Sequence, residues 1–307
     1  MMFLAKGYEE VVFYWLKDCL DNTVKFTLFG LYAAGPGLMV LSWLIKSLAP
    51  IENFNFEIEH HVHSIQGIPT YMEDVHQVVL NAKVCSNNDE LIHYFGLFDG
   101  HSGRKAAEFL FDNLFPKIVK VLKSYSSFPD QNEMKKILIS VFTTIDLEYL
   151  KIALKSNFKD GSTATVVIIH NSDLYVAHVG DSKCAISHST DSNQMESIFL
   201  TRSHHPYLYS ERQRIQKAGS SVINNRVGGN LAVSRSIGDF TYKSKGVISI
   251  PDVKHVTLDE NHNFLVIASD GVWDFVDLED AIKLFYEKDL VDATEGVENL
   301  AAFCEDC

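Results

Sequence analysis

Short apolar runs bounded by turn residues recur along the chain from about residue 62 onward. Runs of this length and composition predict β-strands, and they fall at residues 76–84, 93–98, 163–169, 174–179, 183–187 and 264–268. The segments 171–173 and 180–182 have the composition of tight turns, so we expect them to join three consecutive strands into an antiparallel meander.

Helical periodicity separates these strands. Apolar residues recur at spacings of three and four over residues 104–122 and 133–154, and over the shorter segment 279–287, which predicts amphipathic helices. Helices alternating with blocks of antiparallel strands indicate an α+β sandwich.

The N-terminal region has a different pattern. Residues 26–45 carry no charge and lie between Lys25 and Lys46, and this length matches one bilayer span. We therefore expect a flank at 1–25, a transmembrane helix as anchor at 26–46, a linker at 47–61 and one folded domain at 62–307. Pro36 between two glycines would kink such a helix, so a re-entrant segment and a buried core helix are the alternatives.

Composition narrows the class of function. The 307 residues carry a formal net charge of -13, which repels the phosphate backbone and argues against nucleic-acid binding. The positive-inside rule favours a folded domain outside the cytosol. Five scattered cysteines and the lack of an Asn-x-Ser/Thr site favour a reducing space. We expect a single-pass membrane protein with its domain in the cytosol.

Acidic residues lie at the ends of several predicted strands. They are the pairs Glu73-Asp74, Asp99-Gly100 and Asp270-Gly271, together with Asp181. Rigid strand ends can fix carboxylates, and oxygen ligands of this kind select Mg²⁺ or Mn²⁺. Carboxylates gathered from separate strands would repel one another unless cations neutralised them. The alternative is that these are ordinary turn residues and helix caps.

The sequence blocks around these acidic residues resemble the motifs of a known family. The blocks, in chain order, are YMED (71–74), FDGHSG (98–103), GSTA (161–164), VGDS (179–182), LAVSRSIGD (231–239) and ASDGVWD (268–274). Over residues 62 to about 300 the chain resembles the type 2C family of metal-dependent Ser/Thr protein phosphatases, and its apolar N-terminal segment is similar to that of the family's membrane-anchored members.

The resemblance implies a four-layer α-β-β-α sandwich of two antiparallel sheets flanked by helices, with two Mg²⁺ or Mn²⁺ ions in the cleft between the sheets. Asp99 would bridge both ions, and the carbonyl of Gly100 would bind one of them. Glu73 and Asp74 would hold that ion directly or through its waters. Asp270 would bind the second ion.

The resemblance also implies the reaction: hydrolysis of phosphoserine and phosphothreonine in proteins by a water that the two ions share. His101 would protonate the departing oxygen as general acid. Asp181 and Asp274 match positions of a third, weaker metal. For Arg235 two roles stay open, since it could steer a substrate phosphate or pair with a carboxylate.

Two departures from the family's pattern bear on activity. Pro69 occupies the position of an arginine that grips the substrate phosphate, and Arg104 or Arg235 could substitute for it. The chain ends at Cys307 before the family's last strand, although Asp306 lies near the register of its metal ligand. We expect the missing strand to leave a sheet edge unpaired.

These departures support an alternative function, a membrane-tethered pseudophosphatase that acts as a binding or regulatory module. A two-metal nuclease is a third reading, and the net charge argues against it. The histidines could be written as a zinc site, but no matching cysteine or carboxylate spacing supports that reading. They are His60, His61, His63, His204 and His205.

Overall fold

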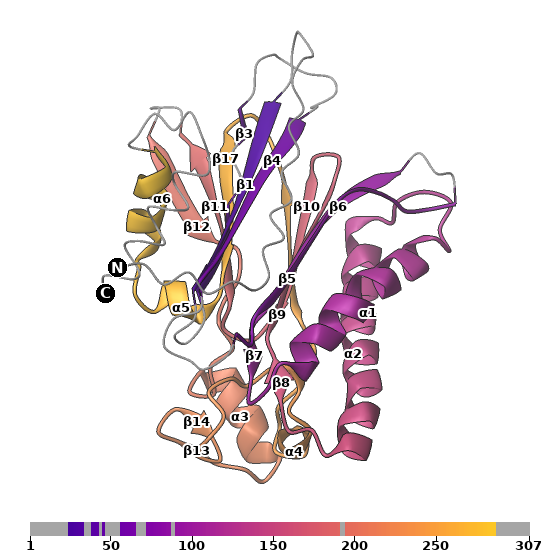
Figure 1. Ribbon diagram of the computed structural model, residues 1–307, viewed down its shortest axis with the longest axis vertical. Coiled ribbons are helices and arrows are strands. Elements are labelled where there is room, and N and C mark those ends of the chain that lie inside the picture. Colours follow the sequence, from indigo (N-terminus) through magenta and orange to yellow (C-terminus); the bar gives the residue numbers. More distant parts are fainter. Residues whose placement is uncertain are drawn as a thin grey trace, which may run out of the picture.

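The computed structural model describes residues 24–33, 38–42, 45–46, 56–65, 72–86, 90–190 and 194–286. Two β-sheets lie face to face, and the helices α1 (Lys105–Leu122) and α2 (Gln131–Ser156) cover one of them, as Figure 1 shows. Helix α6 (Leu278–Tyr286) lies on the other side of the molecule and contacts β12 (Met195–Phe199). The predicted α+β sandwich of antiparallel sheets flanked by helices is confirmed.

The sheet beneath α1 and α2 has five antiparallel strands. Their order is β16 (Asp252–Thr257), β10 (Asp173–Val179), β9 (Ala164–His170), β6 (Leu91–Phe98) and β5 (Val75–Lys83). The central strand β9 is buried at all seven positions, because helices pack on one face of the sheet and the second sheet packs on the other.

The second sheet has seven strands. Their order is β12, β11 (Lys183–Ser189), β17 (His262–Ala268), β2 (Leu38–Ser42), β4 (Phe56–Ile65), β1 (Val24–Ala33) and β3 (Ile45–Lys46). All pairs are antiparallel except β1 with β4, which is parallel. Buried side chains of both sheets meet in one core, among them Phe95, Val167 and Val176 from the first sheet and Cys184, Leu265 and Ile267 from the second.

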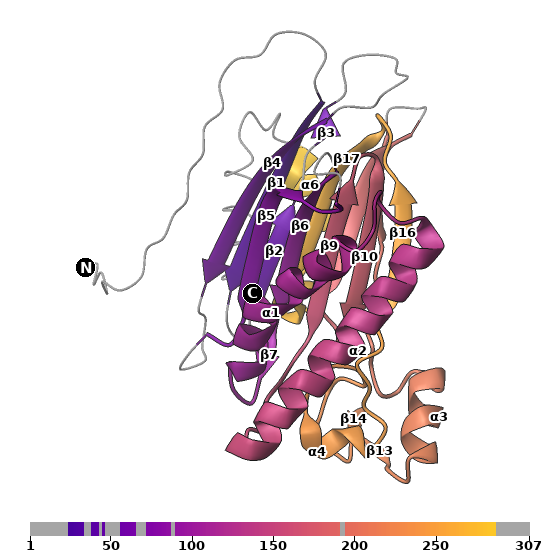
Figure 2. The ribbon, with the colours of Figure 1, turned by 90° about the vertical axis from the view of Figure 1, so that its right-hand side faces the viewer.

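The remaining elements are short and gather mainly at one end of the molecule, at the bottom of Figure 2. Three two-residue strands form a small antiparallel sheet in the order β15 (Ile237–Gly238), β8 (Gly161–Ser162) and β7 (Gly100–His101). The others are α3 (Tyr209–Lys217), β13 (Val222–Ile223), β14 (Arg226–Val227), α4 (Phe240–Lys243) and α5 (Asp270–Trp273).

The predicted meander is correct in its first half and wrong in its second. Strands β9 and β10 pair as expected, but β11 pairs with β12 and β17 in the other sheet. Residues 180–182 therefore carry the chain from one sheet to the other. Gly180 makes this crossing possible, because its φ of +102° is a left-handed conformation and an added Cβ would lie 2.5 Å from Thr163.

The predicted transmembrane helix at 26–46 is not what the structure shows. The described part of this segment forms β1, β2 and β3, and β2 pairs antiparallel with both β1 and β17. Among the helices of the described residues, none combines the length and apolar character needed to cross a bilayer. The physical reason is that a continuous apolar run fits strands as well as a helix, and the sequence Gly35-Pro36-Gly37 is unfavourable within a helix.

Strand β17 has partners on both sides. It pairs with β11 on one side and with β2 on the other, and β2 continues to β4. The unpaired edge expected from the missing last strand stays a prediction. Strand β4 begins at Phe56, inside the segment that we expected to be a linker. Pro69 and Asp306 lie outside the described residues.

Candidate metal centre

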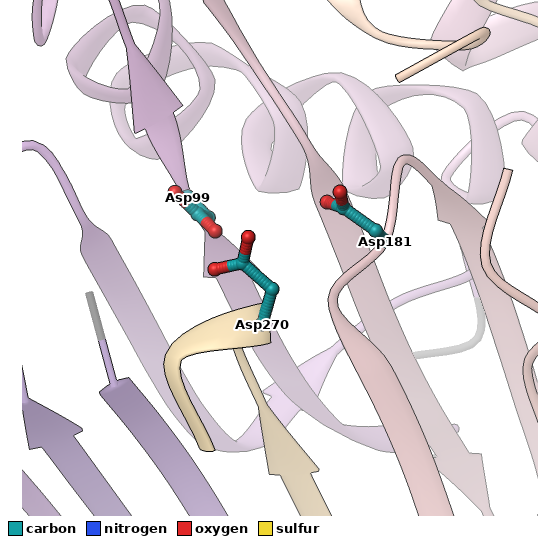
Figure 3. Close-up of side chains that lie close together, drawn as sticks. All are labelled: Asp99, Asp181 and Asp270. Atoms are coloured by element: carbon teal, nitrogen blue, oxygen red, sulfur yellow. The ribbon is translucent and has the colours of Figure 1, made fainter. Parts of the chain in front are cut away.

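Three aspartates from separate elements converge between the two sheets. Asp99 follows β6, Asp181 lies in the crossing between β10 and β11, and Asp270 is the first residue of α5. One carboxylate oxygen from each lies within 4.8 Å of the others, and Figure 3 shows these side chains grouped at the strand ends. With the buried Asp74, whose charge raises the pKa of Asp99, we call this group the carboxylate centre.

Hydrogen bonds fix the backbone that carries these acids. The Thr163 N–H donates to the carbonyl oxygen of Asp99 at 2.8 Å, and the Asp99 N–H donates to Thr163 Oγ1 at 3.1 Å. Thr163 Oγ1 also lies 2.8 Å from Ser182 Oγ, next to Asp181. The two sheets are therefore tied together directly behind the carboxylates, so the acids cannot easily move apart.

The pKa shifts of these aspartates show that grouping their negative charges is unfavourable in the absence of a bound cation. Burial raises the pKa of Asp99 well above its ordinary value, and the charges of Asp74 and Asp270 raise it further. Burial and then Asp181 raise the pKa of Asp270 in the same way. For Asp74, burial raises the pKa to about 7. Each shift means that the ionised form is disfavoured in this pocket.

A divalent cation fits this site by two observations. The donors are carboxylate oxygens, which suit hard ions such as Mg²⁺ and Mn²⁺. Asp74 Oδ2 is buried without a hydrogen-bond partner among the described residues, which is costly unless something binds it. The carboxylate centre therefore has both the charge and the unused ligand atom that a cation needs.

The other predicted ligands lie around this group. Glu73 Oε1 accepts a hydrogen bond from the Gly103 N–H at 2.6 Å. A Cβ on Gly100 would lie 2.6 Å from the Glu73 carbonyl oxygen, so Gly100 is needed for the close approach of these two backbones. Asp274 lies at the end of α5, and its charge raises the pKa of both Asp181 and Asp270.

The His101 imidazole lies in the same region and pairs with Asp239. Its Nε2 is 2.7 Å from Asp239 Oδ2, and the His101 side chain is 27% exposed while that of Asp239 is 3% exposed. Burial disfavours the charged ring, but the carboxylate of Asp239 outweighs burial, and the net effect raises the pKa of His101. A protonated ring that is partly open to solvent can donate a proton.

Arg235 lies in a separate group of charges. Its Nη2 donates to Glu211 Oε1 at 2.7 Å, and its Nη1 donates to Asp252 Oδ1 at 2.7 Å. Arg214 Nη2 donates to Glu211 Oε2 at 2.5 Å. We call Glu211, Arg214, Arg235 and Asp252 the arginine cluster. Of the two roles left open for Arg235, the structure shows the pairing with carboxylates.

Arg104 is the other arginine considered as a substitute at Pro69. Its Nη1 donates to the Met72 carbonyl oxygen at 3.4 Å, and its charge lowers the pKa of Asp74 against the effect of burial. The side chain is 43% exposed and lies 3.8 Å from Glu108. Arg104 is therefore partly exposed at the rim of the carboxylate centre and close enough for its charge to act on Asp74.

The zinc reading of the histidines has no geometric support. In the described part of the chain, the carboxylate group Asp99, Asp181 and Asp270 is the one set of three or more His, Cys, Asp or Glu side chains close enough to share an ion. His204 instead stacks on His178 with ring centroids 4.4 Å apart, and its Nε2 lies 3.3 Å from Asp252 Oδ2.

Sequence reasoning missed several residues of the site. Thr163, Ser182 and Asp239 all lie inside the quoted blocks, but no spacing in the sequence links His101 to Asp239, 138 residues later. Lys183 was also missed. Burial lowers the pKa of its ammonium group, and the carboxylates of Asp274 and Asp181 oppose that shift, so the charge of Lys183 acts on the carboxylate centre, while its Nζ lies 4.8 Å from the centroid of the Phe199 ring.

Comparison with known proteins gives one consistent result. The family model described as "Protein phosphatase 2C" matches residues 58–304. A curated relative from Mus musculus, "Integrin-linked kinase-associated serine/threonine phosphatase 2C", is 35% identical over 262 residues, which is 82% of this chain and 67% of the relative. "Probable protein phosphatase 2C 59" from Oryza sativa is 35% identical over 249 residues, 80% of this chain and 71% of the relative.

A solved structure has the same architecture. It is described as "Crystal structure of serine-threonine phosphatase 2C from Toxoplasma gondii", and it superposes with a TM-score of 0.66 at 21% sequence identity. The superposition covers 90% of this chain and 93% of that chain. At this identity the similarity concerns the fold. The chain spans about two thirds of the length of its mammalian relatives.

Proposed function

The chain belongs to the protein phosphatase 2C family of serine/threonine protein phosphatases, and we propose that its carboxylate centre hydrolyses phosphoserine and phosphothreonine in proteins with Mg²⁺ or Mn²⁺. One observation carries the proposal. Asp99, Asp181 and Asp270 bring their oxygens within 4.8 Å of one another although burial and mutual repulsion raise their pKa values. A protein gains nothing from such a grouping unless it binds cations there.

We propose that the acids would hold two main ions and a weaker third one. Glu73, Asp74, Asp99, the Gly100 carbonyl and Asp270 would hold the two main ions. Asp181 and Asp274 would hold the third ion. When bound, these ions supply Lewis acidity, which makes water a nucleophile near neutral pH and stabilises negative charge on phosphoryl oxygens.

The chain's own residues contribute proton transfer and electrostatics. His101, whose pKa is raised through Asp239, would give a proton to the departing serine or threonine oxygen as general acid. Arg104 lies at the rim, where its guanidinium would attract the substrate phosphate. This placement supports Arg104 over Arg235 as the residue that replaces the family's phosphate-binding arginine, whose position is occupied here by Pro69.

The second candidate function is a pseudophosphatase, and Pro69 is the observation that favours it. Proline offers no donor to a phosphate, so binding and transition-state stabilisation would be weaker by about 2 kcal/mol or more. Retention of the whole carboxylate centre argues for catalysis instead, because a scaffold has no use for unneutralised acids.

The experiment that separates the two functions uses the purified full chain, since β2 pairs with β17 and so belongs to the folded domain. Hydrolysis of a phosphothreonine peptide is measured with increasing Mn²⁺, with Asp99→Asn as the control. Metal-dependent turnover that Asp99→Asn abolishes supports the phosphatase. A folded, monodisperse protein without turnover at millimolar Mn²⁺ would establish the binding module.

The location of the protein is a separate proposal. The scattered cysteines and the lack of an Asn-x-Ser/Thr site support a cytosolic location for the folded domain, whereas the described part of segment 26–45 pairs within the second sheet and gives no support for a membrane anchor. Fractionation of cells that express the full chain tests the location, and recovery of the protein in the culture medium or in the lumen of the secretory pathway would contradict it.

A further inference from the structure

The small three-stranded sheet brings His101 and Asp239 together. In its register, His101 of β7 lies opposite Gly161 of β8, and Gly161 lies opposite Gly238 of β15. Asp239 follows β15 directly, so its side chain reaches across Gly161 to His101, where Oδ2 lies 2.7 Å from Nε2. Figure 1 shows β7 and β8 side by side beneath the ends of the large sheets. Three separate segments thus meet at a single hydrogen bond.

Gly161 leaves the space in which this bond forms. A Cβ at residue 161 would lie 2.2 Å from Asp239 Oδ2 and 2.5 Å from His101 Nε2. Real Cβ atoms do not approach other atoms so closely, and both groups are held by the surrounding sheet. Residue 161 must therefore be glycine, because any side chain there would occupy the space of the His101–Asp239 hydrogen bond.

Asp239 is fixed from every side. It is 2% exposed, and its N–H donates to the Asp160 carbonyl oxygen at 3.0 Å. Ser236 Oγ donates to the same Oδ2 that His101 contacts, at 2.6 Å. The backbone of Asp239 has φ of 50° and ψ of 45°, a left-handed conformation that non-glycine residues adopt only when their surroundings enforce it.

We propose that Asp239 is the positioning residue for the general acid His101, with Gly161 as the spacer between them. The inference rests on the proposed function. A carboxylate only accepts hydrogen bonds, so Nε2 carries the hydrogen that points at Asp239, and Nδ1 is left for the reaction. The pair follows the rule that one ring nitrogen is fixed so that the other can act.

The proton transfer balances in this arrangement. As a water oxygen forms a bond to phosphorus, the bond from phosphorus to the serine or threonine oxygen breaks. Its electron pair goes to that departing oxygen, which takes the proton from Nδ1 of the imidazolium. The ring is left neutral with its hydrogen on Nε2, still bonded to Asp239. A proton from solvent restores the acid form for the next turnover.

The test compares two substrates that differ in their need for an acid. A phosphothreonine peptide releases a strongly basic alkoxide, whereas p-nitrophenyl phosphate releases a stable anion that leaves without a proton. At saturating Mn²⁺, we expect Asp239→Asn to lower kcat/KM roughly 10- to 100-fold for the peptide and less than about threefold for p-nitrophenyl phosphate. Asp173→Asn is the matched control. Asp173 also pairs with a histidine, His255, at 2.6 Å, but it is the first residue of β10, at the end of that strand away from Asp181. This substitution should leave kcat/KM unchanged for both substrates.

A double substitution separates positioning from mere structural support. In a His101→Gln background, Asp239→Asn should cause no further loss for the peptide, because Asp239 acts through His101. An equal loss for both substrates, or a further loss in the His101→Gln background, would overturn the proposal.

A measurement on the unsubstituted chain covers the case in which Asp239→Asn does not fold. Long-range ¹H–¹⁵N spectra of the metal-free protein should show the neutral His101 ring with its hydrogen on Nε2. A ring with its hydrogen on Nδ1 would refute the role of Asp239. If the unsubstituted chain hydrolyses neither substrate, the proposed function fails, and the spectra still decide whether Asp239 holds the ring.

Discussion

Two groups of buried acids in this molecule have opposite electrostatics. In the carboxylate centre, burial and like charges raise the pKa of each aspartate, to about 7 for Asp74. In the arginine cluster, burial opposes ionisation of Glu211, but hydrogen bonds from Arg235 and Arg214 outweigh it and lower the pKa of Glu211 to about 2. A buried carboxylate is thus unsatisfied in one group and neutralised by the protein in the other.

The difference shows which group is available for a ligand. Glu211 Oε2 accepts from Ser234 Oγ at 2.6 Å and from Arg214 at 2.5 Å, and Oε1 accepts from Arg235. A ligand there would have to break bonds that stabilise the fold. Asp74 Oδ2 has no such bond among the described residues. We infer that the arginine cluster is structural and that the carboxylate centre needs an external cation.

The largest expected effect is that of Asp99→Asn on catalysis. Asparagine keeps the shape but removes a charge from the centre, so hydrolysis of a phosphothreonine peptide should fall by about 10³-fold or more. The metal-free protein should at the same time become more resistant to heat, because one repelling charge is gone. Both are measured on the purified full chain, by initial rates and by thermal unfolding.

Asp112→Asn is the control for this change, because Asp112 is exposed on α1. It should leave both rate and unfolding temperature unchanged. If Asp99→Asn lowered the stability of the metal-free protein, the carboxylates would not be in repulsion, and the contrast between the two groups would be lost.

The second effect is on stability and concerns the arginine cluster. Glu211→Gln leaves two guanidinium groups without their shared carboxylate at a position that is 2% exposed, so the free energy of unfolding should fall by about 3 kcal/mol. Urea denaturation measures it. Glu108→Gln breaks an exposed pair with Lys105 and should cost less than about 1 kcal/mol. Equal losses in the two variants would mean that burial of the cluster adds nothing.

How much of this contrast the sequence predicts depends on distance along the chain. The acids of the carboxylate centre could be found because each lies at the end of an apolar run, and the end of a strand can hold a side chain rigidly. The partner of Arg235 could not be found in this way, because Glu211 lies 24 residues away in the sequence and only folding brings it close to Arg235. The pairing of His101 with Asp239 was even harder to predict from the sequence, because these residues lie 138 positions apart.

The fold could be predicted where the periodicity of apolar residues and the length of the segment indicate the same type of element. Residues 104–122 and 133–154 repeat apolar positions at helical spacing and form α1 and α2. The turn at 180–182 was misassigned because tight turns within a sheet and crossings between sheets have the same composition. The segment 26–46 was misassigned because an uncharged apolar run does not distinguish a spanning helix from strands of a sheet.

The third effect is the stabilisation of the carboxylate centre by metal. A ligand that binds only the folded state at 100 times its dissociation constant raises the free energy of unfolding by about 2.7 kcal/mol. We expect Mn²⁺ and Mg²⁺ to give an increase of this order in the unsubstituted chain and none in Asp99→Asn. Urea denaturation with and without metal measures it. The same increase in both proteins would show that the ions bind elsewhere.

The smallest effect is the acid sensitivity of the arginine cluster. The pKa of Glu211 is about 2 in the folded protein and ordinarily 4.5, so the unfolded chain takes up the proton first as pH falls. The stabilisation by ionised Glu211 is therefore complete above pH 4.5 and is lost between about pH 4.5 and 2. At pH 4 the loss should be less than about 1 kcal/mol.

Glu211→Gln isolates this contribution, because glutamine does not titrate. The difference in unfolding free energy between the unsubstituted chain and Glu211→Gln should be constant from pH 7 to pH 5 and should shrink as pH falls below 4.5. Urea denaturation of both proteins at pH 6, 4 and 3 gives the difference directly. Asp252, whose pKa is lowered through His204 and Arg235, titrates in both proteins and largely cancels. A difference that stayed constant down to pH 3 would show that Glu211 is not held as a carboxylate by the two arginines.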